Sequence, residues 1–131
     1  MKGLLLLVFA LLMGIESNAE ELFSVRRVYG FPAGERGIEQ GVSACFAGAI
    51  GHRLLMAGGC NFPEVPAADG GKKRFYRGIY AAPLVKDDSL NWKKVGELPT
   101  ETAYGVSVTL ENGVVCIGGC NASGALRTVV H

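Results

Sequence analysis

A short pattern that occurs twice constrains the fold of this chain more than any other feature. "MAGGCN" begins at Met56 and "CIGGCN" begins at Cys116, so the two copies lie 60 residues apart. Upstream, "GVSACF" from Gly41 resembles "GVSVTL" from Gly105 at an offset of 64 residues, and "FSVRRVYGFP" resembles "LNWKKVGELP" at an offset of 67. The three matches keep the same order in both copies. They indicate a repeated unit whose connecting loops differ in length.

Residue types within one unit predict four β-strands. "GVSVTLEN" alternates β-branched with small or polar residues, and Asn112 and Gly113 then give a tight hairpin signal before the short apolar strand "VVCI". The first copy has the same form, with a slightly longer turn through Gly51 and His52. "RGIYAAPL" and "LNWKKVGELP" follow as a third and a fourth strand. Without helical periodicity after the apolar leader, the sequence predicts an all-β protein with a four-stranded antiparallel sheet.

The first nineteen residues have the form of a secretory signal peptide. One Lys precedes an apolar core from Gly3 to Ile15, and Ser17 and Ala19 occupy the small-residue positions of a cleavage site. The alternative is a membrane anchor, but the core is shorter than the roughly 20 apolar residues that span a bilayer, and no basic stop-transfer cluster follows. We therefore expect a periplasmic or secreted protein with no stable membrane anchor after signal cleavage.

Charge and cysteine spacing restrict the possible partners. The 131 residues carry a net charge of +1, which does not supply the clustered Lys and Arg that phosphate binding requires, so we expect no nucleic-acid partner. The cysteines match no zinc spacing, and we expect no metal. Disulfides are allowed after export, but an extended segment would hold Cys116 and Cys120 about 13 Å apart, too far to bridge. For Cys45 and Cys116 we favour burial in packed strands, and the pairing of Cys45, Cys60, Cys116 and Cys120 stays open.

Three longer segments resemble a known family. The paired glycines, Tyr80 on the third strand and Trp92 at the start of the fourth resemble the Kelch repeat, which forms a β-propeller blade. "AGGCNFPEVPAADGGKKRFYRGIY", "WKKVGELPTETAYGVSV" and "GVVCIGGCN" are similar to the N-acetylneuraminate epimerase (sialic acid mutarotase) family, including its cyclically permuted mutarotases, over roughly residues 41–121. The resemblance implies an isomerase that interconverts the α and β anomers of sialic acid by acid/base ring opening, without a metal or organic cofactor.

Compared with a closed propeller of that family, this chain has few strands. The resemblance divides it into a signal peptide at 1–19 and a partial Kelch β-propeller at 20–131. The propeller part comprises an N-terminal strand and loop at 20–40, a first blade at 41–99 and the start of a second blade at 105–131. We expect about one and a half blades plus a lone N-terminal strand, with the properties of an inactive N-terminal fragment. Open sheet edges would allow it to self-associate.

Two long loops are expected to meet beside the propeller channel. Antiparallel strands send successive turns to alternate faces of a blade, so the loop "CNFPEVPAADGGKKRFY" and the loop "PTETAYG" share one face. Sialic acid carries a carboxylate, and a carboxylate site needs a cation or several N–H donors. The first loop holds a basic cluster of Lys72, Lys73 and Arg74, in which Arg74 is the least favoured candidate for binding the carboxylate. The candidate substrate-binding residues are Asn61, Lys72, Lys73 and Tyr104.

Each candidate also has a structural interpretation. The lysines can be a solvated loop tip, Asn61 a turn residue after the glycines, and Tyr104 a packing residue beside Gly105. Mutarotation needs a base for the anomeric hydroxyl proton and an acid for the ring oxygen. The carboxylates on the two loops are Glu64, Asp69 and Glu101, but nothing in their spacing singles one out, so the catalytic residues stay unknown. His52 and Arg53 are expected on the opposite face.

Two classes of function remain open. The first is the isomerase that the resemblance implies, and the second is a non-enzymatic Kelch module that binds a glycan or a protein through the same face. Anomer exchange distinguishes them, because ligand binding without exchange favours the module. A sialidase is disfavoured, since the Ser-x-Asp-x-Gly-x-Thr-Trp box is absent from these residues.

Overall fold

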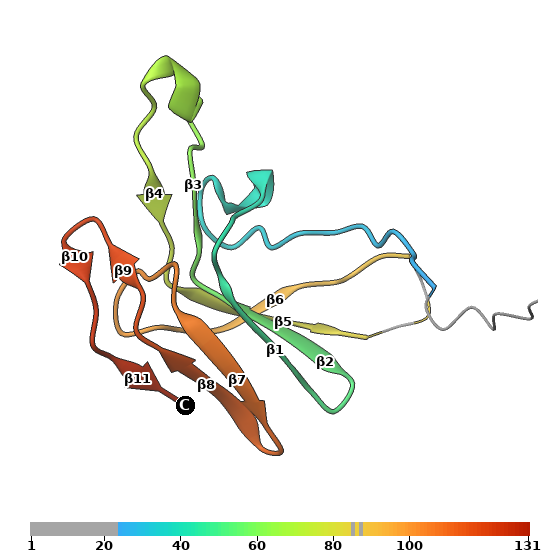
Figure 1. Ribbon diagram of the computed structural model, residues 1–131. Coiled ribbons are helices and arrows are strands. Elements are labelled where there is room, and N and C mark those ends of the chain that lie inside the picture. Colours follow the sequence, from blue (N-terminus) through green and yellow to red (C-terminus); the bar gives the residue numbers. More distant parts are fainter. Residues whose placement is uncertain (1–23, 85, 87) are drawn as a thin grey trace, which may run out of the picture.

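The computed structural model describes residues 24–84, 86 and 88–131, so the signal peptide expected at 1–19 lies outside this part of the chain. The described residues form an all-β structure of short antiparallel strands (Figure 1). Their helical content is limited to two 3-10 turns, η1 at Ile38–Gln40 and η2 at Ala67–Asp69. Within the same residues, no helix has the length and apolar character needed to cross a bilayer.

The first sheet has four antiparallel strands, as expected from the residue pattern. They are β1 (Phe46–Ile50), β2 (Arg53–Ala57), β5 (Gly78–Pro83) and β6 (Lys93–Glu97). The strands pair in the order β1-β2-β5-β6, which is also their order along the chain. The chain therefore zigzags outward from β1, which lies next to the second sheet.

The second sheet has three strands in the order β11-β8-β7. They are β7 (Val106–Leu110), β8 (Gly113–Ile117) and β11 (Val129–Val130). β11, near the C-terminus, pairs with β8 as the third strand of this sheet. Two short two-stranded ladders follow the glycine pairs, and the sequence did not predict them. They are β3 (Cys60–Asn61) with β4 (Arg74–Phe75), and β9 (Cys120–Asn121) with β10 (Gly124–Ala125).

The structure corrects the alignment of the two repeats. β1, β2 and β3 begin at residues 46, 53 and 60, and β7, β8 and β9 begin at 106, 113 and 120, so one 60-residue offset applies to these three strands. "GVSVTL" therefore corresponds to "CFAGAI", and the predicted match to "GVSACF" is wrong. The prediction of a longer first turn is also wrong, because residues 51–52 and 111–112 form turns of equal length. The length of this turn fixes the register of the two strands that it joins. The shared Gly-Val-Ser letters do not fix that register.

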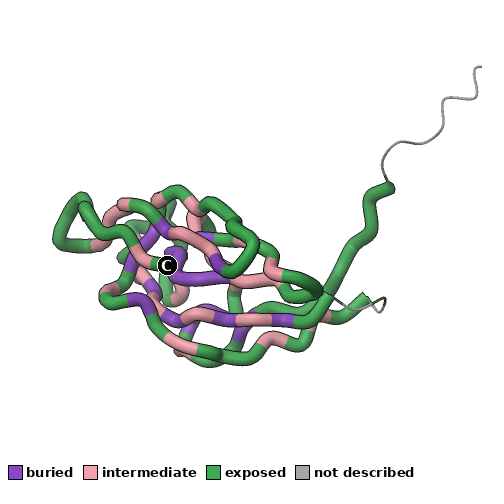
Figure 2. Tube along the Cα trace, turned by 90° about the horizontal axis from the view of Figure 1, so that it is seen from below, coloured by how far each residue is buried: buried purple, intermediate pink, exposed green. Residues whose placement is uncertain are grey.

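The segment before the first sheet forms no strand among the described residues. Within the expected strand and loop at 20–40, Tyr29 makes a single parallel bridge with Ser89. Arg26 donates a hydrogen bond of 2.7 Å to the carbonyl of Lys86, in the connection between β5 and β6. A strand needs a continuous partner edge, and the segment meets a connecting loop instead. Its exposed residues extend away from the sheets (Figure 2).

Two apolar clusters hold these parts together. Ile38 packs with Met56, Tyr76 and Tyr80, which joins the N-terminal segment to the first sheet. The second cluster joins the two sheets and consists of Phe46, Ala57, Leu98 and Cys116. Figure 2 shows buried residues along the inner strands and exposed residues along the loops. Both long loops emerge from this packed base, so their positions depend on how the two sheets meet.

Candidate functional site

Paired glycines follow the second strand of each blade. Gly58 and Gly59 have φ angles of 64° and 96°, and the equivalent Gly118 and Gly119 have angles of 64° and 99°. These left-handed conformations favour glycine, because a Cβ atom is strained there. The chain then turns into the short β3 or β9 ladder. In the first repeat the loop between β3 and β4 projects well beyond the sheets (Figure 1).

The two loops meet, as the sequence predicted. The Lys73 ammonium donates a hydrogen bond of 2.7 Å to the Tyr104 hydroxyl. The second loop is fixed by backbone bonds, since the N–H of Gly59 donates to the carbonyl of Thr102 at 2.8 Å, and the N–H of Tyr104 donates to the carbonyl of Ala44 at 2.9 Å. The first repeat therefore holds the backbone on either side of Tyr104 in place.

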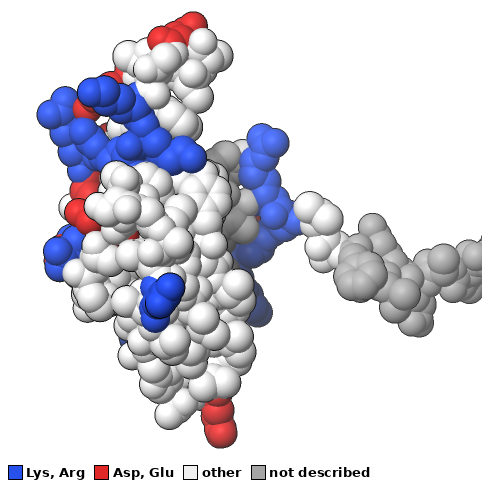
Figure 3. All heavy atoms as spheres, turned by 60° about the vertical axis from the view of Figure 1, so that its left-hand side comes forward, with Lys and Arg blue, Asp and Glu red and all other residues white. Residues whose placement is uncertain are grey.

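Lys73 lies among aromatic rings at the surface. Its ammonium is 4.8 Å from the ring centroid of Tyr104 and 5.6 Å from that of Phe62, within the range of cation–π attraction. The hydrogen bond to Tyr104 raises the pKa of Lys73, so the ammonium keeps its charge at neutral pH. Figure 3 shows Lys and Arg side chains gathered below the tip of this loop. The site offers an exposed, positioned cation beside two rings.

Tyr104 does not pack as a core residue. Its side chain is 52% exposed, and the ring next to Gly105 belongs to Phe46. The backbone of Tyr104 has a φ of 63°, but the equivalent Ala44 has a φ of 56°. The left-handed conformation is therefore a property of the repeat. What distinguishes Tyr104 is its exposed phenol, which is directed to Lys73.

Asn61 is engaged in structural hydrogen bonds. Its amide nitrogen donates to the carbonyls of Gly37 and Gly41, both at 2.8 Å, and its amide oxygen accepts from the Tyr76 hydroxyl at 2.8 Å. These bonds use both of its N–H donors. Asn61 therefore ties the start of the loop to η1. Lys72 is exposed, and within the described residues its side chain makes no hydrogen bond or ion pair.

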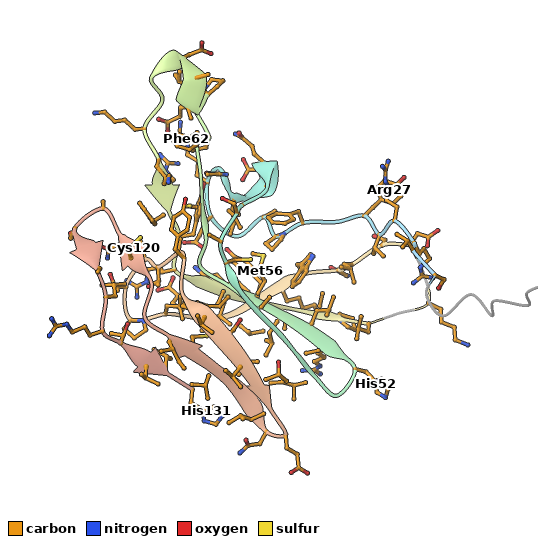
Figure 4. The ribbon with its side chains drawn as sticks, viewed as in Figure 1. Arg27, His52, Met56, Phe62, Cys120 and His131 are labelled. Carbon is orange, nitrogen blue, oxygen red and sulfur yellow. The ribbon has the colours of Figure 1, made fainter. Side chains whose placement is uncertain are left out.

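The carboxylates of the loops differ in their surroundings. Glu64 pairs with Arg74 at 2.8 Å, which neutralises both groups. Asp69 lies in η2, and Glu101 is exposed and accepts a hydrogen bond of 3.3 Å from Thr100. His52 lies in the β1–β2 turn, at the end of the sheet opposite to Phe62 (Figure 4). These contacts leave the acid and the base unassigned.

Comparison with known proteins places this architecture in a family. The family model for N-acetylneuraminate epimerase matches residues 13–131. The chain belongs to the N-acetylneuraminate epimerase family. The N-acetylneuraminate epimerase of Vibrio vulnificus strain YJ016 is 30% identical over 116 residues, which cover 85% of this chain and 30% of that protein. N-acetylneuraminate epimerase 1 of Escherichia coli O6:H1 is 36% identical over 102 residues, which cover 70% and 26%.

A solved structure agrees with this membership. The structure of YjhT matches with a TM-score of 0.57 and 32% identity, covering 68% of this chain and 27% of that one. YjhT is a β-propeller, and the two sheets described above are therefore propeller blades. The chain described here spans less than a third of the length of the relatives that it matches.

One organising residue of this epimerase-family chain was missed by sequence reasoning. The Glu35 carboxylate accepts hydrogen bonds from the backbone N–H of Gly78 at 3.0 Å and from the Tyr80 hydroxyl at 2.9 Å. Burial of Tyr80, together with this bond to Glu35, raises the pKa of its phenol. Glu35 thereby fixes the N-terminal segment to the start of β5. A single Glu between glycines gave no signal for this role.

The four cysteines of this family member are free thiols in the structure. Cys60 and Cys116 are buried, and Cys45 and Cys120 are half-buried. Burial raises the pKa of the Cys45 and Cys116 thiols, which lowers their reactivity at neutral pH. Over the described residues, no group of three or more His, Cys, Asp or Glu side chains is arranged to hold a metal ion.

Proposed function

We propose that the surface around Lys73 and Tyr104 binds N-acetylneuraminate, as part of a site that interconverts its α and β anomers. The observation that carries the proposal is the contact between the two loops, which holds an exposed ammonium 2.7 Å from a phenol hydroxyl. The Lys73 ammonium would bind the sugar carboxylate through a charge-assisted hydrogen bond. The names of the relatives support the choice of sugar.

The surroundings of Lys73 suit a sugar acid. The rings of Phe62 and Tyr104 offer apolar surface for the C–H faces of the ligand, and the Tyr104 hydroxyl can donate to a carboxylate or to a ring substituent. Asn61 is expected to position the loop rather than to contact the sugar, because its amide N–H groups donate to the carbonyls of Gly37 and Gly41. Lys72 takes no part in the proposed contact.

Anomer exchange follows a balanced acid/base route. A base removes the proton of the anomeric hydroxyl, the bond between the anomeric carbon and the ring oxygen breaks, and an acid protonates that oxygen. The open-chain ketone then turns its other face to the hydroxyl, and the reverse steps close the ring. Lys73 would hold the carboxylate on the reacting carbon during this rotation. The proposal assigns neither the acid nor the base to a residue of this chain.

The binding part is tested by NMR titration of the ¹⁵N-labelled chain with N-acetylneuraminate. We expect backbone signals of the two loops to shift, and Lys73→Met to raise the apparent Kd at least about tenfold, because it removes the cation. Lys72→Met is the matched control on the same loop and should bind like the unmodified chain. The methyl ester of the sugar, which has no carboxylate charge, should bind as weakly as the free sugar binds to Lys73→Met. Equal affinities of the two lysine variants would overturn the proposed role of Lys73.

The isomerase part is tested by exchange spectroscopy on the two anomers of the free sugar. An exchange rate above the spontaneous rate, lowered by Lys73→Met and unchanged by Lys72→Met, supports an isomerase site within this chain. Binding through Lys73 with no acceleration assigns this chain to ligand binding alone. Signals that do not move at any sugar concentration reject both parts of the proposal.

A further inference from the structure

The Tyr104 hydroxyl is an acceptor toward Lys73 and an open donor on its other side. Its oxygen accepts the hydrogen bond of 2.7 Å from the Lys73 ammonium. An ammonium carries donors and no acceptor, so the hydroxyl proton is directed away from Lys73. Within the described part of the chain no protein group accepts this proton, and the side chain is 52% exposed. The proton is therefore available to a bound ligand.

The other three tyrosines of the chain differ from Tyr104. The hydroxyls of Tyr76 and Tyr80 donate to protein side chains at 2.8 and 2.9 Å, and both tyrosines are buried. Tyr29 is exposed, but it lies beside the connection between β5 and β6, outside the two long loops. Among these described tyrosines, Tyr104 combines an exposed hydroxyl with the neighbouring cation of Lys73.

The spacing of the two head groups suits the anomeric centre of N-acetylneuraminate. The carboxylate group and the ring oxygen of this sugar are both bonded to the anomeric carbon, so they lie side by side. The Lys73 ammonium and the Tyr104 hydroxyl also lie side by side, 2.7 Å apart. A sugar held on Lys73 through its carboxylate would bring its ring oxygen next to Tyr104. A general acid needs this proximity, because it must lie roughly 2.6–3.2 Å from the atom that it protonates.

We propose that Tyr104 is the general acid that protonates the ring oxygen during ring opening. The inference rests on the proposed binding of the sugar at Lys73, and it adds a catalytic role that binding alone does not require. The Tyr104 proton passes to the ring oxygen as the bond between that oxygen and the anomeric carbon breaks, while water takes the proton of the anomeric hydroxyl. The phenolate left on Tyr104 is stabilised by the ammonium 2.7 Å away. On closure the new hydroxyl oxygen attacks either face of the ketone, its proton returns to Tyr104, and the protonated water returns its proton to the carbonyl oxygen.

Tyr104→Phe tests the acid, because it removes the hydroxyl and keeps an aromatic ring beside the Lys73 ammonium. Exchange spectroscopy at saturating N-acetylneuraminate should show the acceleration falling at least about a hundredfold, the lower end of what a general acid contributes. The Kd from NMR titration should change less than about threefold, since the cation remains. Tyr29→Phe, at an exposed position outside the long loops, is the matched control and should accelerate exchange like the unmodified chain. Circular dichroism of both variants confirms folding.

A second readout does not depend on the rate. In a chain whose tyrosines carry ¹³C at Cζ, the signal of Tyr104 is assigned by its absence from Tyr104→Phe. This signal should shift when the sugar binds, because the hydroxyl then donates to the ligand, and the signal of Tyr29 should stay in place. A Tyr104 signal that stays in place while the loop signals move would show that the hydroxyl does not contact the sugar, and would overturn the inference.

The rate measurement separates the acid from the sugar site. Equal acceleration by Tyr104→Phe and the unmodified chain at saturating sugar overturns the acid role, and a raised Kd in that variant then assigns the hydroxyl to binding alone. An unmodified chain that binds the sugar without acceleration also overturns the acid role, but it leaves the proposed binding at Lys73 in place. Loop signals that do not move at any sugar concentration reject the sugar site, and the acid role with it.

Discussion

Single side chains at the base of the β3–β4 loop determine its position relative to the first sheet. Asn61 connects the loop to η1 and to Tyr76, and Glu35 connects the N-terminal segment to β5. Burial raises the pKa of the Tyr76 phenol, so the hydroxyl remains a donor over the physiological range. These hydrogen bonds are partly buried. Loss of one partner there lowers the free energy of unfolding more than it would at the surface. They hold the backbone that carries Lys73.

Replacing Tyr76 by Phe should destabilise the chain by about 1–2 kcal/mol, because the amide oxygen of Asn61 loses its donor in a half-buried site. Urea unfolding followed by circular dichroism measures this change. Tyr29→Phe, at a largely exposed position, should leave the unfolding midpoint unchanged. Equal midpoints for the two variants would show that water replaces the lost hydroxyl and that the network contributes little.

At the scale of elements, equivalent positions of the two repeats share a conformation but not an environment. Gly58 and Gly118 both have a φ of 64° at the end of the second strand of their blade. A Cβ atom on Gly58 would collide with the carbonyl oxygen of Thr102, whereas on Gly118 the nearest atom is the carbonyl oxygen of Leu126 at 3.6 Å. The glycine at 58 thus permits close approach of the second loop, and the glycine at 118 is needed only for its backbone angle.

Alanine at the two positions separates these effects. Both variants should lose about 1–2 kcal/mol from the left-handed backbone. Gly58→Ala should lose roughly 2 kcal/mol more, since the loop that carries Tyr104 must move away. Thermal unfolding of the two variants under identical conditions gives the comparison. Losses of the same size would mean that the Thr102 carbonyl adjusts without cost.

The ends of β5 and β6 carry a pH-sensitive ion pair. The Lys94 ammonium at 2.7 Å and the Arg77 guanidinium at 2.8 Å lower the pKa of Glu97 below its ordinary value of 4.5. The folded state then binds fewer protons than the unfolded state, so the contribution to stability is present above about pH 4.5 and is lost as the pH falls through the lowered pKa. Glu97→Gln should lower the Tm slightly at pH 7, and the difference in Tm should shrink as the pH falls through the lowered pKa. A Tm difference that stays the same at every pH would assign the effect to something other than charge.

At the scale of the whole molecule, the contact between the blades decides where the site lies. β1 packs beside β7 and β8, and Phe46 fills the space between the sheets with Leu98 and Cys116. The same contact positions residues 102–104, whose backbone bonds to both repeats. The loop contact at Lys73 therefore depends on apolar packing at some distance from it.

Phe46→Ala should destabilise the whole chain by about 3–5 kcal/mol, because it opens a cavity between the sheets. Both blades should be affected together, so Trp92 fluorescence and amide exchange in β8 should report the same loss. Val95→Ala, on the outer strand, should cost less than about 0.5 kcal/mol. Exchange protection in β8 that survives while Trp92 unfolds would show that the blades fold independently.

Much of the chain's architecture followed from the sequence because its signals are local. Alternation of residue types marked the hairpins, and the glycine pairs marked their ends, so an all-β chain with two blade units was predictable. The meeting of the two long loops also followed, since antiparallel strands send their connections to fixed sides. Lys73 and Tyr104 could be selected as candidates for this reason.

What the tertiary structure decided concerns pairs of residues that are distant in the chain. The 60-residue register could not be read from the Gly-Val-Ser identity, because hydrogen bonds across a hairpin, not sequence similarity, set which residues correspond. Asn61 turned inward and Tyr104 stayed exposed, although residue type allowed either arrangement for both. Glu35 acquired its role only because the chain brings it to Gly78 and Tyr80. Local preferences determine strands and turns, whereas the partner of a donor, an acceptor or an apolar face depends on which segments the fold brings together.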